Sequence, residues 1–120
     1  MLFSSTEMKK HKSRLVELMV QELLFLNADL SLRLLASYVN LPTNHMSQLL
    51  NEGFQQNFSE FVNTYRLQTF QDKIKNDSAH RLTMLAVAYD SGFNSKTVFN
   101  TFFKKKTGMT PRAYLNQIKA

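Results

Sequence analysis

The sequence predicts an all-α fold of about seven helices, and three observations support this prediction. Only two prolines and three glycines occur among 120 residues. No window alternates apolar and polar side chains strictly enough for a β-strand. Apolar residues recur instead at spacings of three and four, which places them along one side of a helix. Ten phenylalanines and no tryptophan further indicate cores built around Phe.

The first helix is expected to span about Lys12 to Leu26. Most of its inward side is apolar, which is typical of a helix that packs on a core. Residues 1–30, the N-terminal segment with this helix, should therefore pack on the first of two subdomains. The inward side consists of Leu15, Leu18, Met19, Glu22 and Leu26.

Two shorter helices are expected in residues 31–57. Ser31 is a good N-cap for the first of them, because its hydroxyl can accept a bond from a free backbone N–H. Asn40-Leu41-Pro42-Thr43 ends this helix, a further helix runs from about Thr43 to Asn51, and Gly53 to Asn57 is expected to form a loop. The expected buried residues are Leu32, Leu35, Ala36, Val39, Met46, Leu49 and Leu50.

A long central helix is expected over residues 58–76, and Asn76-Asp77-Ser78 is a turn signal after it. A helix of this length, about 18 residues at ~1.5 Å per residue, would extend ~27 Å. Successive major grooves on one face of B-DNA lie ~34 Å apart. A helix of this length could therefore hold two recognition helices about one turn of DNA apart. Its packing side is predicted to be Phe58, Phe61, Val62, Tyr65, Phe70 and Ile74.

Three helices are expected in residues 77–120. The first runs from about Thr83 to Ser91, and Gly92 ends it because a tight turn needs positive φ. The second starts near Ser95, continues to Lys106 and ends at Gly108 as a C′ residue. Thr110 caps the last helix, with Pro111 at its first position. The residues predicted to be buried in the second helix are Val98, Phe99, Phe102 and Phe103.

Residues 31–57 and the region around residues 83–106 share a pattern. Ala36 stands four residues before Asn40, and Ala88 stands four before Gly92. Asn and Gly are the residues that best tolerate a left-handed turn, and a small residue one helical turn earlier lets two helices approach closely. After the turn, Met46 matches Phe99 and Leu50 matches Phe103. The repeat predicts two helix-turn-helix units, against the alternative of a plain bundle with accidental self-similarity.

The net charge of +6 is concentrated near the C-terminus. Residues 31–57 carry Arg33 against Glu52, whereas residues 83–120 carry six basic residues against Asp90 alone. Such a basic segment suits a polyanion, and nucleic acid is the commonest one. The alternative is a solvated surface that keeps the protein soluble.

The run from Leu30 to Asn116 resembles the DNA-binding region of AraC/XylS-type transcription regulators. Its strongest segment holds Ala88, Gly92-Phe93, Phe99, Phe103-Lys104-Lys105, Thr107-Gly108 and Thr110-Pro111 at the spacing of that family's signature. A second segment, Asn57 to Leu67, resembles the family's central helix with its Arg66-Leu67 pair. The resemblance implies seven helices, with helices three and six in adjacent major grooves. It also implies a separate sensing or dimerisation domain ahead of this region.

Four positions depart from the family pattern. Asn40 stands where a glycine is usual, and the glycine after helix three falls at Gln55, while this chain has Gly53 instead. Phe70 replaces a common alanine, and Thr101 replaces a frequent arginine of the second recognition helix. We therefore expect a re-routed loop after helix three and a different packing in the middle of the central helix.

A recognition helix needs polar side chains on its outer face that reach base edges or phosphates. Asn and Gln can offer a paired donor and acceptor to adenine, whereas basic side chains and helix N-termini suit phosphates. Each position could instead be an ordinary solvated one, and Arg66 could bridge the two subdomains rather than bind phosphate. The base-reading candidates are Asn44, Ser47, Gln48, Asn51, Lys96, Thr97, Asn100 and Thr101. The phosphate candidates are Thr43, Arg66, Ser95, Lys104, Lys105, Lys106 and Arg112.

Catalysis, metal binding and a cofactor are not expected. The chain has no cysteine, so it offers no thiolate ligand or nucleophile, and a reducing cytoplasm is the expected compartment. His11, His45 and His80 are scattered without carboxylates at ligand spacing. No Ser–His–Asp grouping or Gly-rich phosphate loop occurs. The longest apolar run, Leu23 to Leu26, is too short to cross a bilayer, and we expect no signal peptide.

The expected partner is double-stranded DNA at an operator or promoter. RNA polymerase and an upstream sensing or dimerisation domain are further candidate partners, and no membrane contact is expected. Two other functions stay open: a helical protein-interaction module that uses its first helix, and a sequence-blind nucleic-acid binder. Binding to specific and random duplex would separate the three.

Overall fold

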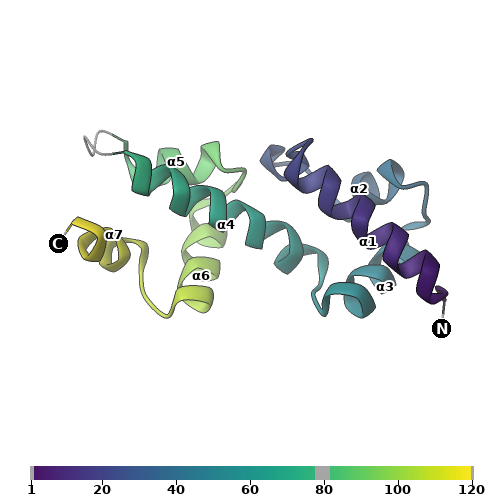
Figure 1. Ribbon diagram of the computed structural model, residues 1–120. Coiled ribbons are helices and arrows are strands. Elements are labelled where there is room, and N and C mark those ends of the chain that lie inside the picture. Colours follow the sequence, from purple (N-terminus) through teal and green to yellow (C-terminus); the bar gives the residue numbers. More distant parts are fainter. Residues whose placement is uncertain (1, 78–81, 120) are drawn as a thin grey trace. The chain divides into compact units, whose positions relative to one another are not determined.

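The computed structural model describes residues 2–77 and 82–119, and the regular secondary structure in these ranges is helical (Figure 1). No strand occurs in the described residues, so the all-α prediction is confirmed. The chain forms two compact units, Met1–Val62 and Asn63–Ala120. The elements are α1 (Ser5–Val20), a 3-10 turn η1 (Leu24–Leu26), α2 (Leu32–Tyr38), α3 (Thr43–Phe54), α4 (Phe58–Asn76), α5 (Met84–Asp90), α6 (Lys96–Thr107) and α7 (Pro111–Lys119).

Helix α1 begins earlier than the sequence pattern predicted. The Ser4 hydroxyl accepts a bond from the Glu7 N–H at 3.1 Å, and the Glu7 carboxylate accepts one from the Ser4 N–H at 3.0 Å. This capping box starts the helix at Ser5 rather than near Lys12, since it satisfies backbone donors that a helix start leaves free.

Helix α1 also ends earlier than predicted, at Val20. Leu23 adopts a left-handed φ of 55°, so the helical period does not continue past it. The predictions that Glu22 and Leu26 face inward were therefore wrong: Glu22 is exposed and Leu26 is 38% exposed. Phe25 is buried instead, at 4% exposed.

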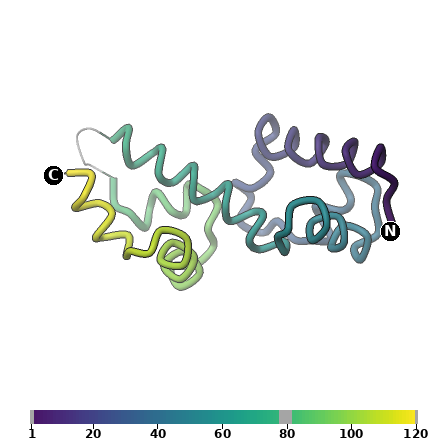
Figure 2. The backbone as a smooth tube through the Cα atoms, turned by 60° about the horizontal axis from the view of Figure 1, so that its bottom comes forward, coloured from purple at the N-terminus to yellow at the C-terminus, as the bar shows by residue number. Residues whose placement is uncertain are grey.

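The first helix-turn-helix unit consists of α2 and α3, which pack against each other, and α1 packs on α3 (Figure 2). Ser31 caps α2 as predicted, with its hydroxyl 3.0 Å from the Leu34 N–H. Asn40 has a φ of 57°, which confirms that it takes the left-handed position of the turn. Ala36 is 1% exposed, so the small side chain lies where the two helices meet.

The loop predicted from Gly53 was wrong, because α3 continues to Phe54. A Cβ built on Gly53 would lie 3.0 Å from the Met8 Sδ and 3.2 Å from the Lys12 Cγ. Glycine at this position therefore lets α1 approach α3 rather than ending the helix. The left-handed end falls at Gln55, with φ 54°, so the residue that replaces the family's glycine adopts the glycine conformation itself.

The second unit has an aromatic core. Phe70 lies in the middle of α4, and its ring centroid is 4.7 Å from that of Phe99 and 5.7 Å from that of Phe103. The large side chain at this position thus contacts two rings of α6. The buried cluster comprises Leu67, Phe70, Ile74, Val87, Ala88, Phe93, Phe99, Phe102 and Phe103.

The ends of α5, α6 and α7 follow the sequence pattern closely. Thr83, Ser95 and Thr110 each accept a bond from the backbone N–H three residues later, at 3.1 Å. Gly92 and Gly108 have φ of 106° and 77°, as a turn and a helix end require.

The predicted burial of Val98 was wrong, since Val98 is 42% exposed. The inward face of α6 is formed by Phe99, Phe102 and Phe103. Val98 precedes Phe99 and is rotated away from this face.

Candidate nucleic-acid interface

The outer face of α3 carries four of the predicted base-reading residues. They lie opposite the buried Met46, Leu49 and Leu50, because the helix repeats every ~3.6 residues. Two of the four side chains are exposed to solvent and two are half-buried. Asn44 and Asn51 are exposed, and Ser47 and Gln48 are half-buried.

One of these four side chains has a partner within the chain. The Gln48 Nε2 donates a hydrogen bond to the Glu52 Oε1 at 2.8 Å. Among the described residues, the side chains of Asn44, Ser47 and Asn51 form no hydrogen bond, so their donors and acceptors face solvent. The sequence-based site omitted Glu52, although its spacing of four from Gln48 on a helix was a signal that could have found it.

Helix α6 presents a longer polar surface. Lys96, Thr97, Asn100 and Thr101 are all exposed. Lys96 and Asn100 are spaced by four residues, and so are Asn100 and Lys104, which places these three side chains along one edge of the helix.

A groove of about 440 Å³ runs along this edge. Lys96, Asn100 and Lys104 line it from α6, and Arg112 lines it from the start of α7. Its apolar lining includes Met84, Leu85 and Pro111. No acidic residue of the described chain lines the groove, so three cations surround a surface suited to an anion.

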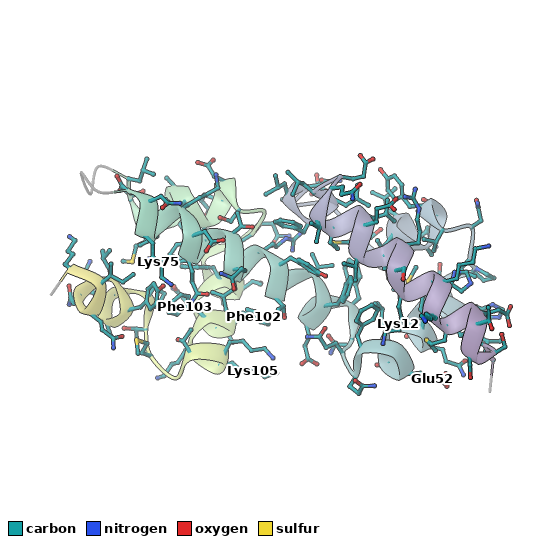
Figure 3. The ribbon with its side chains drawn as sticks, viewed as in Figure 1. Lys12, Glu52, Lys75, Phe102, Phe103 and Lys105 are labelled. Carbon is teal, nitrogen blue, oxygen red and sulfur yellow. The ribbon has the colours of Figure 1, made fainter. Side chains whose placement is uncertain are left out.

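The remaining phosphate candidates differ in their surroundings. The Ser95 hydroxyl accepts a bond from the Val98 N–H, so it caps the start of α6. Lys105 is exposed on α6, where Figure 3 labels it beside Phe102 and Phe103. The Lys106 Nζ lies 5.6 Å from the centroid of the Phe102 ring. Thr43 is exposed at the first residue of α3.

Arg66 is buried, at 8% exposed, unlike the other phosphate candidates. Its Nη1 donates a hydrogen bond to the Asn63 Oδ1 at 3.0 Å. Burial lowers the pKa of the Arg66 guanidinium from its usual value. The guanidinium is thus less accessible to a phosphate than the lysines of α6 are.

The described residues contain no group of three or more His, Asp and Glu side chains that could hold a metal ion. The His11 ring packs edge-on against Phe3, at 5.3 Å between centroids, and His80 lies outside the described residues. No helix in the described ranges is long and apolar enough to cross a membrane.

A family model described as a helix-turn-helix domain matches residues 35–117. Uncharacterized HTH-type transcriptional regulators from strains of Staphylococcus aureus are 33% identical over 97 residues, which is 76% of this chain. The chain spans about 12% of the length of these curated relatives.

Two solved structures share the fold. One is the C-terminal domain of the two-component response regulator yesN from Fusobacterium nucleatum, with a TM-score of 0.75, 20% identity, and coverage of 88% of this chain and 98% of that one. The other is the C-terminal domain of AraT, a response regulator from Geobacillus stearothermophilus. Its TM-score is 0.71 and its identity 18%, with coverage of 98% of this chain and 88% of that one.

Proposed function

Since the chain belongs to the AraC-type helix-turn-helix family of DNA-binding transcription regulators, we propose that it binds duplex DNA sequence-specifically through α3 and α6, as the DNA-binding part of a larger sensor-regulator. The family is one of regulators rather than of enzymes. The short span of the chain within its curated relatives supports a larger protein. In that protein an upstream sensing or dimerisation domain and RNA polymerase are the proposed further partners, and the cytoplasm is the proposed compartment.

The exposed polar face of α3 is the observation that supports sequence reading best. A face of Asn44, Ser47, Gln48 and Asn51 offers amide and hydroxyl groups but no basic side chain. Amides discriminate between base edges, whereas a phosphate-binding surface would be rich in Lys and Arg. We therefore assign base reading to these four residues.

The basic groove beside α6 supports contact with the DNA backbone. Lys96, Lys104 and Arg112 surround it, and a phosphodiester is the anion that a neighbouring duplex would bring. We propose that Lys104 and Arg112 neutralise phosphates, while Lys96, Thr97, Asn100 and Thr101 contact bases. Ser95, Lys105, Lys106 and Thr43 are proposed as further phosphate contacts, and Arg66 in a lesser role because it is buried.

The length of α4 supports the proposal that α3 and α6 enter adjacent major grooves. The helix has 19 residues. At ~1.5 Å per residue it extends about 28 Å, which is close to the ~34 Å of one B-DNA turn. A monomer should then occupy an asymmetric site of roughly 20 base pairs.

Selection from a randomised duplex library tests this function. The chain is expected to enrich an asymmetric motif and to bind it more tightly than random duplex at physiological salt, and mass measurement is expected to find one chain per site. Equal binding of all duplexes would indicate a sequence-blind binder, and no duplex binding would indicate a protein-interaction module. A palindromic motif bound only by dimers would contradict the one-chain model.

A further inference from the structure

The hydrogen bond between Gln48 and Glu52 fixes which way the Gln48 amide points. A carboxylate can only accept, so the group that faces Glu52 at 2.8 Å must be the Gln48 NH₂ rather than its carbonyl. Glu52 forms no ion pair with any described residue. The nearby Lys12 Nζ lies instead over the Phe54 ring, 5.3 Å from its centroid, and Figure 3 labels Lys12 on α1 and Glu52 on α3.

The bond to Glu52 is compatible with base reading by the same amide. An amide NH₂ carries two hydrogens, and the bond to Glu52 uses one of them. Where the bond uses the hydrogen anti to the carbonyl oxygen, the syn N–H and the carbonyl oxygen remain together as a donor–acceptor pair. That pair is the one with which Gln contacts the N7 and N6 groups of adenine in the major groove.

Glu52 occupies an electrostatically unfavourable place for a carboxylate. It lies in the last turn of α3, where the helix dipole disfavours negative charge. It also neighbours Gln48, which is proposed to read bases, and the negative charge of the DNA repels an anion there. A role in orienting Gln48 would explain why a carboxylate occurs at this position despite both unfavourable interactions.

We propose that Glu52 is a specificity-positioning residue that holds Gln48 in the orientation that reads adenine. This inference rests on the proposed function of α3. The alternative is that the pair only stabilises the surface of the helix, as such pairs commonly do.

The test compares base preferences of variants selected on the same randomised duplex library. Gln48→Ala first maps the base position that Gln48 reads, where adenine preference should fall at least about fivefold. Glu52→Met, which keeps the approximate size of the side chain but accepts hydrogen bonds only weakly, should lose most of that preference at the same position. Glu52→Gln should retain an intermediate preference, because its carbonyl can still accept from Gln48 in one of two arrangements.

Binding to random duplex separates orientation from charge. Glu52→Met and Glu52→Gln each remove one negative charge, so both should bind random duplex more tightly than the parent chain and by similar factors. Glu22→Met is the matched control, since Glu22 is an exposed carboxylate of the same unit. It should leave the adenine preference unchanged. In the free protein, Glu52→Met should also shift the Gln48 side-chain NH₂ resonances while circular dichroism shows unchanged helix content.

Three results would overturn the inference. The first is that Glu52→Met keeps the adenine preference that Gln48→Ala loses, and the second is that Glu52→Met and Glu52→Gln lose it equally. The third is that Gln48 reads a base other than adenine. If the parent chain enriches no motif at all, the proposed function fails and the inference fails with it. This outcome is distinguishable from the three above, because each of them requires that the parent chain enriches a motif.

Discussion

The Tyr114 hydroxyl is buried and has no hydrogen-bond partner among the described residues. The ring itself packs well, edge-on to Phe103 at 5.3 Å between centroids. A buried polar group without a partner costs roughly 1–3 kcal/mol of desolvation.

We therefore expect Tyr114→Phe to raise the free energy of unfolding by about 1 kcal/mol, because the ring stays and the unpaired hydroxyl goes. Urea denaturation monitored by circular dichroism measures the change. A loss of stability in this variant would show that the hydroxyl is hydrogen-bonded in solution.

At the scale of single residues, the sequence predicted burial where the apolar pattern and a turn agreed, and failed elsewhere. Ala36 and Ala88 were predicted to let two helices approach closely, and both are at most 1% exposed. Val98 and Leu26 were predicted to be buried because they are apolar, yet neighbouring phenylalanines occupy the inward positions. The partner of Gln48 was missed because an acidic side chain is not expected on a helix that is predicted to contact DNA.

At the scale of helices, caps were the most predictable feature. Ser31, Thr83, Ser95 and Thr110 start helices as expected, since a hydroxyl beside free N–H groups is a local signal. The end of α3 could not be predicted in this way. In the sequence, Gly53 is typical of a helix breaker. Only the structure shows that the absence of a side chain at Gly53 lets α1 pack closely on α3.

The capping box at the start of α1 makes part of the stability dependent on pH. The Ser4 backbone N–H, followed by the Ser4 hydroxyl, lowers the pKa of Glu7 below its ordinary value of 4.5. A carboxyl group whose pKa is lowered by folding stabilises the folded state above its unfolded pKa. That contribution is lost as the pH falls through the lower, folded-state pKa.

Glu7→Gln keeps a hydrogen-bond acceptor but cannot ionise, so it isolates this contribution. The parent chain should be more stable than the variant at about pH 7, and the difference should shrink as the pH falls below about 4.5. Chemical denaturation of both chains over this range measures it. A stability difference that stays constant down to about pH 3 would contradict the assignment.

At the scale of the whole molecule, charge is divided unequally between the two helix-turn-helix segments. Residues 31–57 carry Arg33 against Glu52, whereas residues 83–120 carry six basic residues against Asp90. Phosphate neutralisation supplies much of the affinity of DNA-binding proteins, with a salt slope of about −0.9 per phosphate contacted. We therefore propose that the C-terminal segment anchors the protein and the N-terminal one mainly discriminates sequence.

The paired substitution Lys104→Ala and Lys105→Ala should weaken binding to specific and random duplex alike and flatten the salt slope by roughly one to two. Gln48→Ala should weaken only the selected site, by about 1–3 kcal/mol. Fluorescence anisotropy titrations over a series of salt concentrations measure both effects. The division of labour is wrong if Gln48→Ala lowers both affinities equally, or if the lysine pair changes only the sequence preference.

The aromatic core of the second unit should shift the NMR resonances of the methyl groups packed in it. The buried cluster contains five phenylalanine rings together with Ile74 and Val87. Ring currents displace the resonances of methyl groups that lie close to aromatic faces, and repacking by even a small distance changes that displacement. The methyl spectrum should therefore report the packing of this unit during a DNA titration. A change confined to the leucines of the first unit would show that the first unit binds DNA without repacking of the second.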